Sequence, residues 1–225
     1  MHFWCGYNCL LQKDSQLDTP RAVAVSDVIK IASDLQNRIP DRSWMLYLLE
    51  IFNRQGIPIE LDLICSFNDD GKFHAIFGGR NRYEFKVRPV VGHSYLRQIV
   101  MEPHQGGIRY LLMDEVSGQT DSFLFKVEGQ FDYQISRLFT GLEWHNKTGN
   151  LPFSIPYEVE VSNLAYGLHD DPSDPRSVAY LPYNQLTPDS EGLGKEYPVL
   201  FGDFGVRNGF ITYRIGPGKQ GTAYM

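Results

Sequence analysis

The segment IPIELDLICSF, residues 57–67, decides the fold class of this chain. Apolar residues occupy every second position of this run, and Glu60 and Asp62 alternate with them. Successive side chains of a β-strand point to opposite faces, so the pattern predicts a strand with one buried face. The sequence NDDG follows at residues 68–71 and predicts a hairpin, because Asp-Gly tolerates the positive φ angles of a tight turn.

Runs of the same kind continue along the chain and are separated by clusters of Gly, Asn and Asp. They predict strands at Trp44–Phe52, Ile57–Phe67, Lys72–Phe77, Tyr83–Val87, Gln98–Glu102, Ile108–Glu115, Ser122–Glu128, Leu138–Trp144, Tyr157–Tyr166, Val199–Phe204 and Phe210–Ile215. Many short strands with a turn about every 8–12 residues are typical of sandwiches and jelly rolls. We therefore predict a mostly β fold, a two-sheet antiparallel sandwich of jelly-roll type.

Residues 26–39 fit two patterns. Ser26 suits a helix N-cap, apolar residues follow at helical spacing, and Pro40 would end the helix, so we predict one short N-terminal helix here. The abundance of Val and Ile instead favours a strand over residues 22–31. Residues 1–25 are expected to form an edge strand or a packed arm.

The length of 225 residues suits one substantial core. We predict a single domain over residues 1–215. Within it, residues 167–198 are rich in Pro, Gly and Asp and are expected to form a long loop or arm. Residues 216–225 are expected to form a flexible tail.

Composition and charge exclude several classes of function. The formal net charge is -6 and no basic run occurs, which argues against a nucleic-acid binder. No segment reaches the roughly 18 consecutive apolar residues of a membrane helix. The odd number of cysteines, 3, fits a reducing compartment, and residues 1–7 do not resemble a secretory signal. We expect a cytoplasmic protein with no membrane partner, and the sequence leaves the oligomeric state open.

The first candidate site is the run Glu143-Trp144-His145 at the end of a predicted strand. In an extended chain Glu143 and His145 share one face, where a carboxylate and an imidazole can perform acid–base catalysis. Trp144 points to the other face and is a candidate for stacking on a ligand. The alternative is that Trp144 belongs to the core and its two neighbours are solvated.

The second candidate is the polar turn that contains Glu102, His104 and Gln105 beside a Gly pair. Glu102 could help Glu143 to form a catalytic cleft, and His104 and Gln105 could bind ligand. The alternative is an ordinary turn between two strands.

Two further features concern binding. Tyr83 and Arg88 lie in or beside a run of alternating charges that could form the rim of a ligand-binding sheet, although such a run also suits a solvent-exposed face. Acidic loops at residues 69–70, 114–115 and 170–174 offer oxygen ligands for Ca²⁺, but none has EF-hand spacing. We predict no other metal and no cofactor.

The strand rhythm and turns at residues 78–87, 108–114 and 117–120 resemble those of concanavalin A-like jelly rolls. The resemblance covers residues 43–166 and implies a superfamily of lectins, carbohydrate-binding modules, glycoside hydrolases and glutamic peptidases. The run GLEW at residues 141–144 is faintly similar to the glutamic-peptidase arrangement, in which a Gln and a Glu on a concave sheet activate water. This likeness implies that Glu143 takes the place of the Glu, whereas the predicted strand before residue 53 contains no Gln.

Three functions follow as hypotheses. The leading one is a binding protein that presents a concave, aromatic-lined sheet to an extended ligand, with a glycan as the favoured ligand. The second is a hydrolase on the same scaffold, a glycosidase or a glutamic-peptidase-like enzyme, with Glu143 as acid or base. The third is a structural or assembly protein that holds a partner through edge strands and the 167–198 arm.

Overall fold

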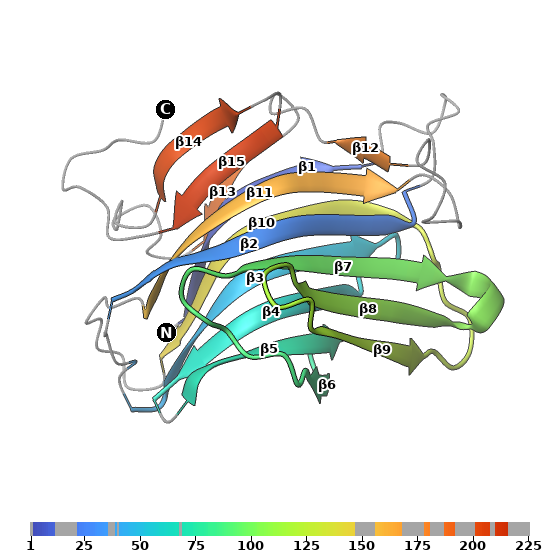
Figure 1. The fold of residues 1–225 in the computed structure, drawn as a ribbon. Helices are drawn as coiled ribbons and strands as arrows, with labels where there is room; N and C mark the ends of the chain where they lie inside the picture. Colours follow the sequence, from blue (N-terminus) through green and yellow to red (C-terminus); the bar gives the residue numbers. More distant parts are fainter. Residues whose placement is uncertain are drawn as a thin grey trace.

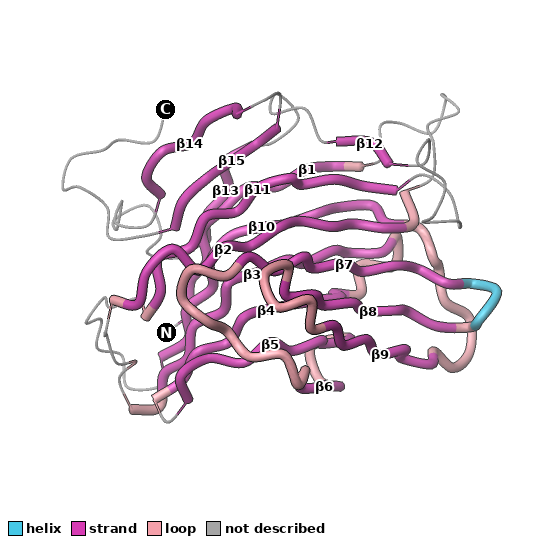
Figure 2. Tube along the Cα trace, in the orientation of Figure 1, coloured by secondary structure: helices cyan, strands magenta, loops and turns pink. Residues whose placement is uncertain are grey.

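The computed structural model shows two antiparallel β-sheets packed face to face (Figures 1 and 2). It describes residues 2–11, 22–35, 39, 41–67, 69–146, 156–167, 178–180, 187–191, 201–207 and 210–215. The predicted class, a mostly β two-sheet sandwich, is confirmed. Strands from both ends of the described chain join the same two sheets.

The seven-stranded sheet has the order β13 (Thr187–Glu191), β1 (His2–Leu10), β10 (Ile135–Asn146), β3 (Ser43–Asn53), β4 (Pro58–Ser66), β5 (Asp69–Phe77) and β6 (Asn81–Glu84). The eight-stranded sheet has the order β14 (Phe201–Arg207), β15 (Phe210–Ile215), β11 (Tyr157–Gly167), β2 (Ala24–Asp34), β7 (Ser94–Glu102), β8 (Gly107–Asp114) and β9 (Thr120–Lys126). The short β12 (Val178–Tyr180) pairs with β11. β1 is therefore not an edge strand, because β10 and β13 flank it.

The core between the sheets is built by the alternation that the sequence shows. In β4 the residues Ile59, Leu61, Leu63 and Cys65 are fully buried between the sheets. Burying an aliphatic side chain of this size stabilises the fold by about 1.5–3 kcal/mol. The intervening positions of β4 point to the outer face of the seven-stranded sheet, where the candidate site lies.

Two buried tyrosines tie the sheets together across the core. The Tyr47 hydroxyl of β3 donates a hydrogen bond to the Tyr157 carbonyl of β11 at 2.7 Å. The Tyr110 hydroxyl of β8 donates to the Ile76 carbonyl of β5 at 3.0 Å. These bonds satisfy the hydroxyls that burial would otherwise leave without a partner.

Stacked aromatic rings close the sandwich where β5 and β6 approach β9. Tyr83 stacks on Phe123 with ring centroids 4.2 Å apart, and Phe77 stacks on Phe125 at 4.6 Å. The Tyr83 hydroxyl also lies 3.4 Å from the Asp121 carboxylate. This edge of the sandwich is packed by side chains from both sheets.

The predicted N-terminal helix is wrong, because residues 24–34 form strand β2. The competing strand prediction was correct. Val25, Ile29 and Ile31 alternate toward the core, and the β-branched residues suit a pleated surface. Asp27 interrupts the apolar alternation and is itself fully buried. Among the described residues the helical turn is the short 3-10 helix Pro103–Gln105.

The segment 167–198 is not simply the predicted long loop. It contains β12, which pairs with β11, and β13, which pairs with β1. The predicted closing hairpin is confirmed, because β14 and β15 pair in antiparallel fashion. The predicted tail, residues 216–225, lies outside the described residues. Within the part of the chain that the structure describes, no helix is long and apolar enough to cross a bilayer.

Candidate active site

Four carboxyl groups from three adjacent strands gather on the outer face of the seven-stranded sheet. Glu50 of β3 lies directly opposite Glu60 of β4 in the strand register. Asp62 follows two positions later in β4 and therefore shares the face of Glu60. Glu143 of β10, the strand on the other side of β3, is close enough to raise the pKa of both Glu50 and Glu60. We call these four groups the carboxyl cluster.

Burial and like charge keep a proton on Glu50. Burial, followed by the charges of Glu60 and Glu143, raises the pKa of Glu50 to about 8. The charge of Arg137 acts in the opposite direction. Carboxyls placed directly opposite each other repel when both are ionised. Glu50 is therefore suited to act as an acid near neutral pH.

Glu60 has a pKa between those of ordinary carboxyls and Glu50. The pKa of Glu60 is raised to about 7, and burial is the largest cause. A hydrogen bond with Asp62 and the charge of Arg82 lower it, whereas the charge of Glu143 raises it. Arg82 belongs to β6 and lies in line with Glu60 across β5, on the charged run that the sequence predicted as a rim.

Asp62 is the most deeply buried member of the carboxyl cluster. Its Oδ1 accepts a hydrogen bond from the Leu49 backbone N–H at 3.2 Å. Its Oδ2 is buried as well. Burial, and then the neighbouring Glu60, raise the pKa of Asp62 well above its ordinary range. His74 of β5 lies opposite Asp62 in the register. Because adjacent buried carboxyls cannot all ionise, the cluster shares protons.

Glu143 and His145 share this outer face, as expected for alternate residues of an extended strand, and their side chains pair there. Nε2 of His145 lies 3.1 Å from Oε1 of Glu143, and the His145 ring stacks on Trp44 at 4.8 Å. Both side chains are partly exposed, at 19% for Glu143 and 28% for His145. Trp144 points into the core and is fully buried, so its ring is not on this face.

An apolar platform surrounds the carboxyl cluster. Its members share the outer face of the seven-stranded sheet and pack together: Trp44, Leu46, Leu48, Ile64, Ile76 and Phe139. A side chain at Gly6 of β1 would collide with the Thr140 backbone and contact the Phe139 ring, so glycine permits this close packing. The platform lowers the local polarity and contributes to the raised pKa values.

The second predicted group does not join the first. Glu102 ends β7 in the eight-stranded sheet, and its carboxylate pairs with Nε of Arg109 at 2.7 Å. His104 and Gln105 are exposed on the adjacent 3-10 helix. Glu102 and Glu143 lie on the outer faces of opposite sheets, with the core between them. The predicted shared cleft is therefore not formed.

The other predicted binding residues lie away from the carboxyl cluster. Tyr83 is half-buried in the aromatic edge, and Arg88 is exposed and pairs with Glu84 at 2.9 Å. Their role in ligand binding stays a prediction.

Of the three acidic loops, the structure describes the side chains of only the one at residues 114–115. Burial alone would raise the pKa of Asp114, but hydrogen bonds from Ser117, His93 and the Val116 N–H lower it to about 2. Asp114 thus stabilises its own turn. The side chains of residues 69–70 and 170–174 lie outside the described residues. Among the described residues no group of three or more His, Cys, Asp or Glu is arranged to hold a metal ion.

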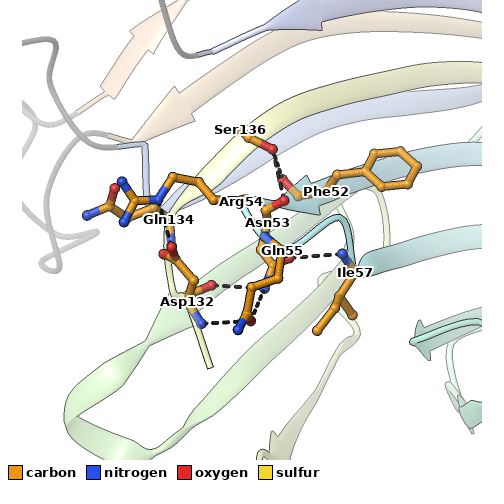
Figure 3. Close-up of polar contacts among 8 residues, drawn as sticks. All are labelled: Phe52, Asn53, Arg54, Gln55, Ile57, Asp132, Gln134 and Ser136. Atoms are coloured by element: carbon orange, nitrogen blue, oxygen red, sulfur yellow. Dashed lines mark hydrogen bonds and ion pairs between the residues drawn. The ribbon is translucent and has the colours of Figure 1, made fainter. Parts of the chain in front are cut away.

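A separate open cleft of about 680 Å³ lies where the segment before β10 passes the β3–β4 turn. Its lining consists of Val23, Gln55, Pro103 and residues 129–134. Figure 3 shows how hydrogen bonds fix this wall: the Asp132 carboxylate accepts from Arg54 Nε at 2.7 Å, and the Asp132 N–H donates to Gln55 at 3.1 Å. None of the predicted ligand-binding residues lines this cleft.

Sequence reasoning missed Glu50, Glu60 and Asp62 as a group. The signal was present, because three acids lie at outward positions of two successive strands joined by a short turn. Alternation alone assigns such residues to solvent. Only the register, which sets Glu50 opposite Glu60, shows that their charges meet.

Comparison with known proteins gives the fold. No family model matches this sequence, and no curated protein is similar to it. A structure of scytalido-glutamic peptidase with a transition state analog inhibitor matches with a TM-score of 0.56 and 11% identity, over 93% of this chain and 96% of that chain. SCP-B, a member of the Eqolisin family of peptidases in complex with the tripeptide Ala-Ile-His, matches over the same shares with a TM-score of 0.50 and 12% identity.

A Lotus tetragonolobus seed lectin is less similar, with a TM-score of 0.36 and 12% identity over 61% of this chain and 69% of that chain. The resemblance to concanavalin A-like jelly rolls that the strand rhythm predicted is confirmed at the level of the fold. At these identities the likeness extends to the fold and no further.

Proposed function

We propose that this protein is a hydrolase that uses the carboxyl cluster to cleave an extended polymer lying across the outer face of the seven-stranded sheet. The observation that carries the proposal is the placement of Glu50 opposite Glu60, with pKa values raised to about 8 and about 7. Clusters of carboxyls with displaced pKa values are characteristic of sites that need an acid and a base together.

The surroundings of each carboxyl group determine the role that we assign to it. Glu143 is partly exposed and oriented by His145, so it acts as the base that removes a proton from water while the water oxygen attacks the scissile carbonyl carbon. Glu50 holds a proton near neutral pH and donates it to the leaving nitrogen as the C–N bond breaks. Glu60 lies opposite Glu50 and returns a proton to it from the Glu60–Asp62 pair. The proton that Glu143 took from water then replaces the proton lost by this pair, which restores the site for the next cycle.

A peptide is the first substrate class to test. Three peptidase structures match with TM-scores of 0.50 or more, one with a peptide based transition state analog, one with a transition state analog inhibitor and one with the tripeptide Ala-Ile-His. The apolar platform around Trp44 and Phe139 offers a surface for apolar side chains of such a chain. Two carboxyls can also cleave a glycosidic bond, so a glycan is the competing substrate.

The experiment is an activity screen from about pH 3 to pH 8 with quenched fluorescent peptide libraries and a panel of oligosaccharides. We expect peptide cleavage by the natural sequence and a loss of at least about 100-fold in Glu143→Gln and in Glu50→Gln. Glu158→Gln is the matched control, because Glu158 is a half-buried carboxylate of the other sheet that accepts a hydrogen bond from Ser33 Oγ at 2.9 Å. Cleavage that survives in both site variants, or no cleavage of any substrate, contradicts the proposal.

A second candidate function is glycan binding in the cleft beside the β3–β4 turn. Phe131 and Tyr133 lie in its wall with ring centroids 4.9 Å apart, among the amides of Gln55, Gln130 and Gln134. Aromatic faces combined with amides suit sugar rings, which present both apolar faces and hydroxyls.

Thermal shift against oligosaccharides, with and without Ca²⁺, tests this second function. A ligand that binds only the folded state raises the melting temperature by mass action. We expect a shift with one class of sugar that is lost in Gln130→Ala, a variant at an exposed position, and kept in Glu143→Gln. A shift lost in Glu143→Gln instead would place sugar binding at the carboxyl cluster.

A further inference from the structure

The backbone ladder between β3 and β4 is interrupted behind the carboxyl cluster. Pairing runs in one register from Trp44 opposite Ser66 to Tyr47 opposite Leu63, and it resumes at Glu50 opposite Glu60. The two steps between them are not paired. A gap in the middle of a sheet leaves buried carbonyl and N–H groups that need other partners.

The side chain of Arg97 fills this gap from the core side. It extends from β7 of the opposite sheet, and its Nη1 donates to the carbonyls of Tyr47 at 2.7 Å and Leu61 at 3.0 Å. Its Nη2 donates to the Leu48 carbonyl at 3.3 Å. Asp27 of β2 holds the guanidinium in two-pronged fashion, with bonds of 2.9 and 2.6 Å, and both side chains are fully buried.

One peptide group connects Arg97 to the carboxyl cluster. The carbonyl of Leu48 accepts from Arg97 on the core side, and the N–H of the same peptide unit, which belongs to Leu49, donates to Asp62 on the outer side. Hydrogen bonds in series polarise one another, and Arg97 also acts directly on the Asp62 charge. The buried cation is thus coupled to the outer carboxyls through the sheet.

We infer that Arg97 is a positioning residue for the carboxyl cluster: it holds the peptide unit that anchors Asp62 and sets which member of the Glu60–Asp62 pair carries the shared proton. The inference rests on the proposed function for its role in catalysis, whereas the coupling itself does not. The titratable and charged groups that face the Glu60–Asp62 pair are Glu50, Arg82, His74, Arg97, Tyr110 and Glu143, with Asp27 behind Arg97.

The test is a carboxyl ¹³C NMR titration without substrate, with the signals of the pair assigned by Glu60→Gln and Asp62→Asn. Removing both buried charges in the double variant Asp27→Asn/Arg97→Gln should move the titration of the pair to higher pH, by about one pH unit. Asp27→Asn alone leaves the cation without its counter-charge and should move the titration to lower pH. The single variant Arg97→Lys keeps the charge, so the midpoint of its titration should stay close to that of the natural sequence.

Arg109→Gln is the matched control, because Arg109 is a cation of the same sheet that pairs with Glu102 on its outer face. It should leave the titration unchanged. If the double variant does not fold, the downward shift in Asp27→Asn decides the question. Shifts of equal sign in Asp27→Asn and the double variant, or no shift in Asp27→Asn, overturn the inference. Because no substrate is present, this outcome is independent of whether the site hydrolyses anything.

Discussion

Buried charged groups pack against both faces of the β3–β4 strand pair, but their charges are compensated in different ways on the two faces. On the core side Arg97 and Asp27 neutralise each other, and Arg97 also donates hydrogen bonds to backbone carbonyls. On the outer side Glu50, Glu60 and Asp62 carry the same sign of charge and must retain protons. The Arg97–Asp27 ion pair has a structural role, whereas the carboxyl cluster retains protons that can take part in acid–base catalysis.

Breaking the core pair should give the largest effect on stability. Arg97→Ala leaves Asp27 buried without a partner, so we expect the free energy of unfolding to fall by about 3–5 kcal/mol in chemical denaturation. Arg109→Ala breaks a more exposed pair and should cost about 1 kcal/mol or less. Equal losses in the two variants would show that the core pair is no more important than a surface pair.

The outer cluster should make stability depend on pH. Folding raises the pKa of Glu50 to about 8 and of Glu60 to about 7 from an ordinary value of 4.5, so the folded state binds more protons than the unfolded state in this window. Stability from these groups is fully present below pH 4.5 and is lost as the pH rises to 8. Because a pKa difference of one corresponds to about 1.4 kcal/mol, we expect a loss of several kcal/mol, measured by denaturant titration at several pH values.

The double variant Glu50→Gln/Glu60→Gln should flatten this pH dependence, because an amide of nearly the same shape cannot ionise. A slope as steep as that of the natural sequence would assign the pH dependence to other groups.

Tyr47 lies on the core side of β3, so a substitution there changes the packing of the core without changing the carboxyl groups that titrate. Its hydroxyl both donates to the Tyr157 carbonyl and accepts from the Tyr157 N–H. Tyr47→Phe should lower the free energy of unfolding by about 1–2 kcal/mol, since two buried backbone groups lose their partner. The pH dependence described above should remain, and its disappearance would mean that the two faces are not separable.

The smallest effect on stability should come from the partly exposed pair of Glu143 and His145. We expect His145→Ala to change the free energy of unfolding by about 1 kcal/mol or less. Activity on the cleaved substrate should nevertheless fall, because Glu143 loses the group that orients it. A large loss of stability with unchanged activity would assign the pair a structural role.

The sequence predicts the fold better than the site. Alternating runs such as residues 57–67 determine which side chains face the core, and the structure follows them. The prediction failed at β2 because Asp27 occupies an inward position, and the partner that makes this tolerable, Arg97, lies 70 residues away. A buried ion pair between neighbouring strands that are far apart in the sequence leaves no periodic signal in either segment.

The sequence predicts only part of the candidate site, because the rest depends on contacts between strands. Glu143 and His145 lie two residues apart, so the strand geometry alone places them on one face. Glu50 and Glu60 meet only through the register between two strands, and the burial that raises their pKa values depends on packing across the whole sheet. Neither can be derived from one strand at a time.

The most direct measurement is the carboxyl titration of Glu50 and Glu60 in the protein of natural sequence, assigned by Glu50→Gln and Glu60→Gln. Our account predicts midpoints near pH 8 for Glu50 and near pH 7 for Glu60. Midpoints of both groups near the ordinary value of 4.5 would contradict it, because the outer face would then carry fully ionised carboxylates and no stored proton at neutral pH.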